Sequence, residues 1–400
     1  MLTGLYFVAW VFFLAAFAFA KSAQPMARVA VSITVIEHSN ETSSHGIDRG
    51  FLIHVQTTTF ELPENAELMS SLSSLLVNTK GTELLATSRT GHFLKLNLSP
   101  TQDLRLNVTA AEIFPMITSQ RDGSDAEGLS VNGVYEGNGQ GELYVSFGES
   151  QRAMKFMNGV NSQVEDIRSL AGVGKCAMGA KLKAILKLHS TDGDGLLLLA
   201  CGEALTLPTL HRRLDAHNFV FSGWAYNETS GEVKPFYIMA FRSCSLVDMA
   251  QLPDGDVIMI FRYSQEKPEE SRMLLVYITA GSLHQAISTG SSVMPQTMGI
   301  WPGKDNTTRR FPQGLAVRQD EKTKKIFVYI IGAKHLSDSV NEGTHNDLED
   351  YKAFLSVHEW QPTPVAEPTL PPGPSISRAG GLHALTVIWI PMAVAFSTNS

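Results

Sequence analysis

Cysteine is scarce in this sequence, and neither basic nor acidic residues form long blocks. Three cysteines among 400 residues are too few for a scaffold held together by disulfides. Their odd number leaves at least one thiol unpaired within the chain. Cys176 and Cys201 can pair if their strands are neighbours, and buried free thiols are the alternative. A net charge of −7 without a run of lysine or arginine argues against a nucleic-acid partner.

The short motifs of common metalloenzymes and nucleotide-binding proteins are also missing, including His-Glu-x-x-His, Cys-x-x-Cys and Gly-Lys-Ser/Thr. Two near-matches fail on their own chemistry. Gly148-Glu-Ser150 follows a strand-like run as a serine-hydrolase elbow does, but Arg152 stands where the tight turn needs glycine. Asp192-Gly-Asp-Gly195 imitates a calcium loop, but Leu197 occupies the position that requires glycine. We interpret it as a hairpin turn.

Long apolar runs occur at the two ends of the chain. Residues 1–20 end in a small-x-small pattern and predict a signal peptide cleaved after Ala20, with an uncleaved anchor as the alternative. Residues 361–381 form a proline-rich stalk with small residues at its end. The apolar run 382–396 is short for a membrane span of about 20 residues. Stalk and tail together predict a GPI-attachment signal, with a short membrane helix as the alternative.

These ends predict passage through the secretory pathway to the cell surface, with the membrane reached through the C-terminal tail. We expect a monomer. Five Asn-x-Ser/Thr sequons agree with this route. The predicted glycosylation sites are Asn40, Asn97, Asn107, Asn227 and Asn306.

A two-strand unit occurs five times in the middle of the chain. Each copy has a short strand, a turn rich in Gly, Asp or Asn, and a strongly apolar strand, which together indicate a hairpin. The copies occupy residues 72–88, 125–147, 183–203, 247–261 and 313–331. Repeats of this length predict an all-β fold, a β-propeller of about six or seven blades.

We place the propeller domain at residues 68–360, with residues 21–67 as a partly strand-forming N-terminal segment that contributes to it. A large β-sandwich is the alternative architecture. The apolar strands favour the propeller, because consecutive hydrophobic residues suit blades that are buried on both faces.

Carboxylates stand at the strand ends of successive units. In a propeller such ends converge on one face around the central channel, where several carboxylates would suit Ca²⁺ and a bound Ca²⁺ could position a phosphate or activate water. We predict catalytic roles for Asp125, Glu127 and Glu149. The predicted calcium ligands are Asp125, Glu127, Glu203 and Asp248. The alternative is that these carboxylates only accept hydrogen bonds from turn amides.

One family shares this pattern. Asp125-Ala-Glu-Gly-Leu-Ser-Val131 and then Glu142-Leu-Tyr-Val-Ser-Phe-Gly-Glu-Ser-Gln-Arg152 resemble the signature of the phytase-like domain, named for the esterase-like activity of phytase. The resemblance covers roughly residues 68–360. Further stretches agree in order at 72–75, 87–91, 198–203, 246–256 and 261–262. It implies a secreted or envelope-associated propeller with phosphoesterase or esterase activity.

The chain also departs from this family. It reads Ser88-Arg-Thr-Gly91 where Ser-Asp-Arg-Gly is usual, residues 174–179 lack the family's carboxylate, and Gln313 replaces a glutamate. Two functions are therefore weighed. One is a hydrolase of a small phosphorylated or ester substrate, with a calcium-dependent channel site. The other is a catalytically degenerate propeller that binds an extracellular ligand or protein.

Overall fold

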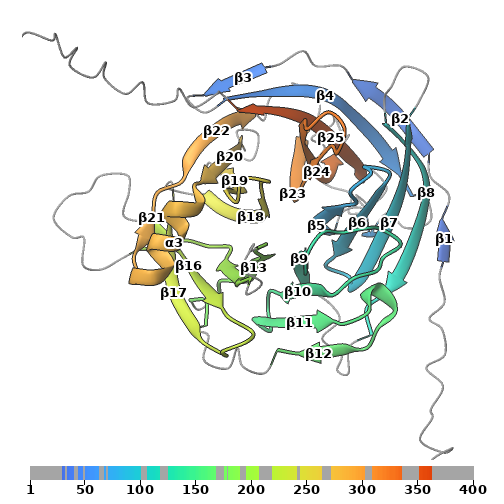
Figure 1. Ribbon diagram of the computed structural model, residues 1–400. Helices are drawn as coiled ribbons and strands as arrows, with labels where there is room; N and C mark the ends of the chain where they lie inside the picture. Colours follow the sequence, from blue (N-terminus) through green and yellow to red (C-terminus); the bar gives the residue numbers. More distant parts are fainter. Residues whose placement is uncertain are drawn as a thin grey trace, which may run out of the picture. The chain divides into compact units, whose positions relative to one another are not determined.

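Five sheets, arranged radially, make up the described part of the chain (Figure 1), and their strands pair antiparallel except at one two-residue edge strand of the third sheet. The chain divides into units of residues 1–363 and 364–400, and every residue that this computed structural model describes belongs to the first. The described residues are 29–31, 34–39, 44–47, 50–62, 67–68, 71–100, 106–117, 125–167, 175–177, 179–189, 195–206, 219–240, 244–263, 272–301, 309–335 and 351–362. The predicted signal peptide 1–20 and the tail 382–396 lie outside them.

Each sheet is described from its innermost strand outward. The first contains β5 (Leu72–Val77), β6 (Glu83–Ser88), β7 (His92–Pro100), β8 (Leu106–Pro115) and β1 (Val29–Val31). The second contains β9 (Ala126–Val131), β10 (Leu143–Phe147), β11 (Arg152–Phe156) and β12 (Val164–Asp166). The third contains β13 (Leu182–Lys187), β14 (Leu197–Cys201), β16 (Phe219–Tyr226), β17 (Val233–Ala240) and β21 (Ser292–Val293), with β15 (Leu205–Thr206) on β16.

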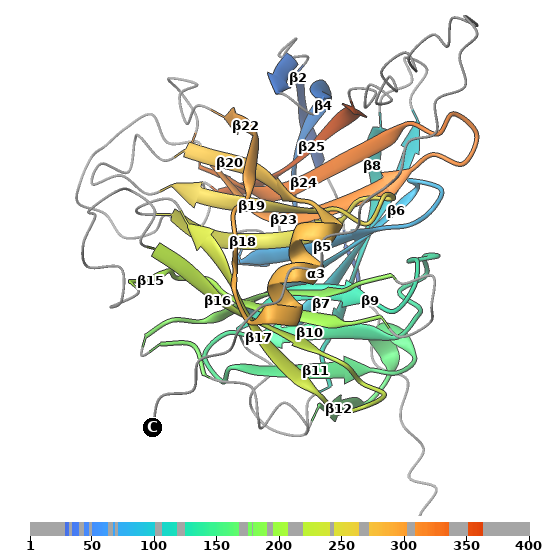
Figure 2. The same ribbon diagram turned by 60° about the vertical axis from the view of Figure 1, so that its left-hand side comes forward.

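The last two sheets follow the same plan. The fourth contains β18 (Cys244–Gln251), β19 (Val257–Tyr263), β20 (Arg272–Ile278) and β22 (Gln296–Trp301). The fifth contains β23 (Arg309–Gln319), β24 (Ile326–His335), β25 (Tyr351–Pro362), β4 (Gly50–Glu61) and β2 (Thr34–Ser39), with β3 (Ser44–Ile47) on β4. The helix α3 (Ala280–Thr289) packs against β17 (Figure 2). Thr279 caps its N-terminus by accepting a hydrogen bond from the Ser282 amide, and Gly290 ends it in the left-handed conformation.

The five innermost strands contact one another in a closed ring. β5 contacts β9, β9 contacts β13, β13 contacts β18, β18 contacts β23, and β23 returns to β5. The fold is therefore a five-bladed, propeller-like arrangement, and the prediction of six or seven blades was wrong. Each of the five hairpins seen in the sequence forms the two innermost strands of one blade. The other strand-like runs became the outer strands of those same blades.

Five hydrophobic clusters fill the five spaces between neighbouring blades. Successive residues of a strand point to opposite faces of its sheet. In β19, Val257, Met259 and Phe261 pack toward the third blade, whereas Ile258 and Ile260 pack toward the fifth. Burial on both faces explains why these strands are continuously apolar in sequence.

The N-terminal segment closes the ring of blades. β4 pairs antiparallel with β25 and so supplies the fourth strand of the fifth blade, while β1 pairs with β8 at the edge of the first. Phe60 and Leu62 then pack into the cluster between the fifth and first blades. Residues from both ends of this unit thus form one sheet.

Gly314 on β23 sets how closely the first and last blades approach. A Cβ there would lie 2.7 Å from the backbone carbonyl carbon of Ser74 on β5 and 2.9 Å from Cγ2 of Ile331.

We expect Gly314→Ala to lower the free energy of unfolding by about 1–3 kcal/mol, as overpacking of a filled core does. Urea unfolding measures this effect. Gly281→Ala on α3 is the matched control, since a Cβ there meets no atom within 4 Å, and an equal loss in both variants would contradict this prediction.

Candidate functional site

A β-bulge interrupts each innermost strand near its start. At that point one residue has no partner on the second strand of its blade. The bulge residues are Ser73, Glu127, Lys183, Val247 and Gln313. An extra residue in a strand redirects a side chain and is common beside functional sites. Here all five blades carry the same distortion at the same level of the ring.

Four of these bulge residues line one cavity of about 170 Å³ at this end of the ring. The ends of the second strands complete the lining. Its charged members are Arg89, Lys181, Lys183, Arg262, Glu127 and Glu203. Among the lining residues, four cationic side chains therefore face two carboxylates.

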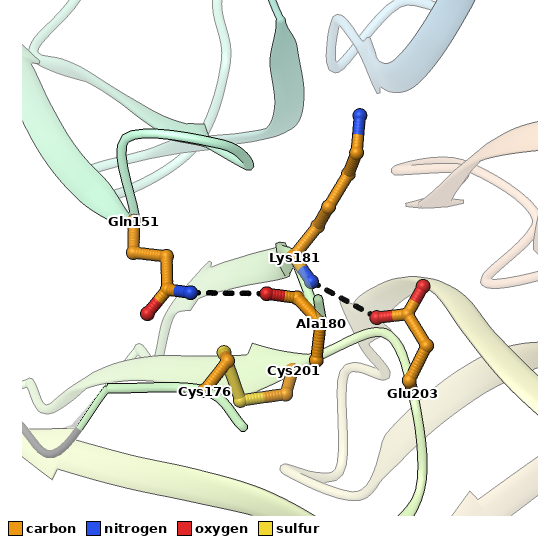
Figure 3. The surroundings of a disulfide bond; sticks show 6 residues. All are labelled: Gln151, Cys176, Ala180, Lys181, Cys201 and Glu203. Carbon is orange, nitrogen blue, oxygen red and sulfur yellow. Dashed lines mark hydrogen bonds between the residues drawn. A yellow bond between two sulfur atoms is a disulfide. The ribbon is translucent and has the colours of Figure 1, made fainter. Parts of the chain in front are cut away.

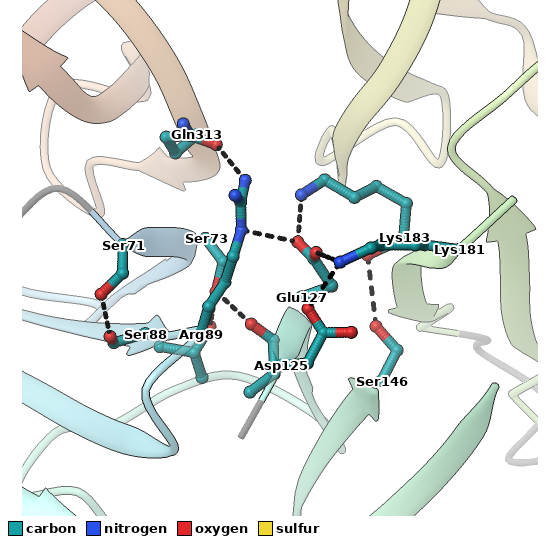
Figure 4. A network of polar contacts seen from close by, with 12 residues as sticks. Ser71, Ser73, Ser88, Arg89, Asp125, Glu127, Ser146, Lys181, Lys183 and Gln313 are labelled. Carbon is teal, nitrogen blue, oxygen red and sulfur yellow. Dashed lines mark hydrogen bonds and ion pairs between the residues drawn. The ribbon is translucent and has the colours of Figure 1, made fainter. Parts of the chain in front are cut away.

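Glu127 is the centre of this charge cluster (Figure 4). Its carboxylate is buried and pairs with the guanidinium of Arg89 at 3.3 Å and with the ammonium of Lys183. The Lys181 ammonium lies 3.9 Å away. Arg89 also donates from Nη2 to Oε1 of Gln313 at 3.1 Å, so the network joins the first, second, third and fifth blades.

Lys181 connects this network to two more carboxylates. Its Nζ lies 3.0 Å from Oδ1 of Asp125 and 3.4 Å from Oε1 of Glu149. Burial by itself would lower the pKa of Lys181, but the hydrogen bond to Asp125 and the surrounding carboxylates raise it overall. Asp125 has a left-handed backbone (φ 75°), which lets its Oδ2 accept a hydrogen bond from the Glu149 amide at 2.6 Å. Strained backbone of this kind is often found at functional sites.

Two cations of the cavity are held in a poorly solvated environment. Burial lowers the pKa of Lys183, against the attraction of Glu127. Burial also lowers the pKa of Arg262, and the positive charge of Arg89 adds to this effect. Among the described residues, the Arg262 guanidinium has no hydrogen bond or ion pair. Its donors therefore remain available to a ligand.

The structure brings together four of the five carboxylates that the sequence singled out. Asp125, Glu127 and Glu149 surround the Lys181 ammonium, and Glu203 accepts a hydrogen bond from the Lys181 amide at 2.9 Å. Within the described part of the chain, no group of three or more His, Cys, Asp or Glu residues is placed to hold a metal ion. The cationic side chains of Arg89, Lys181 and Lys183 lie among these carboxylates and pair with them. Calcium binding therefore remains a prediction from the sequence.

The cations of this site were not predicted from the sequence. Arg89 and Gln313 were noted only as departures from a family pattern, Lys183 only as the start of a hairpin, and Arg262 only within a stretch that agrees with the family. A usable signal was the position itself: Lys183 is the second residue of its innermost strand as Glu127 is, and Arg262 and Arg89 lie close to the ends of the second strands of their blades. Aligning the five units on these positions would have revealed the set.

Asp248 lies apart from this cluster and is completely buried. Its Oδ2 accepts hydrogen bonds from the Ser74 hydroxyl at 2.8 Å and the Leu315 amide at 2.9 Å, and so joins the fourth blade to the first and fifth. Its neighbour Val247 lines the charged cavity, and its other neighbour Met249 lines a second cavity of about 100 Å³. The two sequence neighbours of Asp248 thus line two different cavities. Burial raises its pKa to about 8, against these hydrogen bonds.

Asp248 should make stability depend on pH in an unusual direction. The unfolded chain loses this proton near pH 3.8, whereas the folded protein keeps it up to about pH 8. Between these values unfolding releases a proton, so the free energy of unfolding falls as pH rises. The stabilising contribution of protonated Asp248 is complete below about pH 3.8 and is lost as pH rises through about 8. Urea unfolding at pH 5, 6.5 and 8 should show a steeper fall for the wild type than for Asp248→Asn. Equal slopes in the two proteins would contradict this assignment.

A disulfide joins Cys176 to Cys201, with a Cα–Cα distance of 5.8 Å, and Cys244 is a buried free thiol. The bond lies beside the segment that leads into β13 (Figure 3). In that segment, Gln151 donates to the Ala180 carbonyl at 3.0 Å, and the Lys181 amide donates to Glu203. The disulfide therefore helps to fix the segment from which Lys181 and Lys183 project.

We expect Cys176→Ser with Cys201→Ser to lower the free energy of unfolding by roughly 3 kcal/mol, the chain-entropy value for a closed loop of this order. Dithiothreitol should lower the melting temperature of the wild type and leave that of the double variant unchanged. Equal melting temperatures with and without the reductant in both proteins would show that the bond does not contribute.

The sequons occupy different settings. Asn97 lies on β7 and Asn107 on β8, while Asn227 lies in the turn between β16 and β17. There its Oδ1 accepts hydrogen bonds from the amides of Thr229 and Ser230. Asn40 and Asn306 lie outside the described residues.

No helix in the part of the chain that the structure describes is long and apolar enough to cross a membrane.

Comparison with known proteins identifies no family for this chain. No protein-family model and no curated protein matches the chain. The tail fibre of Staphylococcus aureus phage P68 is similar with a TM-score of 0.37 and 11% identity, covering 82% of this chain and 53% of the tail fibre. The chain thus spans about half the length of that protein. The RRP9 WD40 repeats give a TM-score of 0.35 and 10% identity, covering 84% of this chain and 100% of theirs. Such low scores carry no argument about function, so the phytase-like resemblance stays a prediction.

Proposed function

We propose that this protein is a ligand-binding propeller whose charged cavity holds the anionic group of its ligand without turnover. The observation that supports this is the Arg262 guanidinium, a cavity-lining cation that has no hydrogen bond or ion pair among the described residues. A guanidinium presents a planar set of donors that matches phosphate and carboxylate oxygens. Phosphate and carboxylate share this chemistry, so both are tested below.

The size of the cavity limits what can enter it. The cavity has a volume of about 170 Å³. Pockets that enclose a whole drug-sized ligand hold about 300–1,000 Å³. The site therefore suits a terminal phosphate or carboxylate, with the rest of the ligand outside. The predicted signal peptide and C-terminal tail would display this site at the cell surface.

Turnover is the second candidate function. Glu149 favours it, since its side chain is 76% exposed beside Lys181, where a carboxylate could act as a general base. The other carboxylates favour binding instead. Glu127 is already ion-paired, and Asp125 and Glu203 accept hydrogen bonds from backbone amides. Hydrolysis of a phosphoester or ester, with or without Ca²⁺, remains the alternative proposal.

Calorimetric titration with inorganic phosphate, acetate and p-nitrophenyl phosphate tests the binding function. We expect Arg262→Gln to weaken phosphate binding about 10- to 100-fold, because it removes charged hydrogen bonds worth roughly 1.5–3 kcal/mol. Lys234→Gln, which removes an exposed cation of β17 that does not line the cavity, should leave the affinity unchanged. Melting temperatures of both variants show whether they remain folded.

The same samples test turnover. Steady hydrolysis of p-nitrophenyl phosphate or of a short-chain ester that disappears in Glu149→Gln would replace binding by catalysis as the function. Failure of the wild type to bind either phosphate or acetate would overturn the proposal of an anion site.

A further inference from the structure

Three like charges meet around a single buried carboxylate in this cavity. Arg89, Lys181 and Lys183 all lie within ion-pair distance of Glu127, whose side chain is only 2% exposed. Like charges that are poorly solvated repel strongly, so the cations need an anion between them to remain in these positions. Glu127 is the anion that all three share.

The three cations differ in what else holds them. Lys181 has Asp125 and Glu149 as further partners, and Arg89 has Gln313. For the Lys183 ammonium, Glu127 is the only ion-pair partner among the described residues. Removal of the Glu127 charge should therefore displace Lys183 most.

We propose that Glu127 is the positioning residue of the anion site. It directs the positive charges of Lys183 and Arg89 toward one point in the cavity. Binding of an anionic ligand therefore depends on a protein carboxylate that is itself negatively charged. This inference rests on the proposed anion-binding function. It departs from the catalytic and calcium-binding roles that the sequence suggested for the same residue.

Glu203 provides a matched control in the same cavity. It carries the same charge, but its Oε2 accepts a hydrogen bond from the Lys181 backbone amide, and it has no ion pair among the described residues. Removing its charge changes the electrostatic potential of the cavity and leaves the shared ion pairs in place. The two glutamates therefore predict effects of opposite sign.

Calorimetric titration with inorganic phosphate compares Glu127→Gln and Glu203→Gln with the wild type. We expect Glu203→Gln to tighten binding severalfold, because a repulsive charge is lost. Glu127→Gln removes the same repulsion, yet we expect it to weaken binding at least about tenfold, as the loss of oriented charged hydrogen bonds does. Unchanged or tighter binding in Glu127→Gln, in a protein with a near-wild-type melting temperature, would overturn the proposal.

A second measurement needs no ligand. Brief treatment with acetic anhydride followed by peptide mass spectrometry reports how well each lysine amine is protected. We expect Lys183 to react faster in Glu127→Gln than in the wild type, and to keep its wild-type rate in Glu203→Gln. A Lys183 rate that Glu127→Gln does not change would reject the positioning role. Absence of phosphate binding in the wild type, with Lys183 protection dependent on Glu127, would reject only the proposed function.

Discussion

Burial of both faces of every blade is the constraint on which the rest of this structure depends. Each sheet has apolar side chains on its two sides, and a neighbouring blade covers each side, with α3 added to the cluster between the third and fourth blades. No blade can bury its surface alone, so the ring must close, and β4 closes it by completing the fifth sheet. Once closed, the ring holds the innermost strands so near one another that Gly128 and Gly314 leave no room for a side chain against the adjacent strand.

The same constraint concentrates chemistry at one end of the ring. Backbone hydrogen bonds join neighbouring blades there, from the Asp125 amide to the Arg89 carbonyl, from Leu182 to Gly148 and from Leu246 to Gly202. They fix near-equivalent positions in successive blades, and four of the five bulges direct a side chain into the cavity at that level. The backbone repeats from blade to blade, whereas the side chains at these positions differ. Equivalent bulge positions therefore carry a carboxylate, an ammonium and an amide in one ring.

Much of the fold could be predicted from the sequence, and less of the site. The five hairpins were recognised because alternation and turn residues are local signals, and the blade number was wrong because the outer strands were not assigned to those hairpins. Asp125, Glu127 and Glu149 were grouped correctly as strand ends. Asp248 was grouped with them wrongly, since the bulge places Val247 at the position equivalent to Glu127. A bulge changes the face on which a residue lies without a mark in the hydrophobic pattern.

Closure by β4 also has a consequence for synthesis. Roughly 290 residues separate Glu61 at the end of β4 from Tyr351 at the start of its partner β25. At about 5–20 residues per second, the ribosome needs some 15 to 60 seconds to produce the partner after β4 itself has been made. During that interval β4 has an open edge toward the fifth blade and its apolar residues are uncovered. The ring is therefore completed only once β25 has been made, and until then the nascent chain presents the unpaired edge of β4.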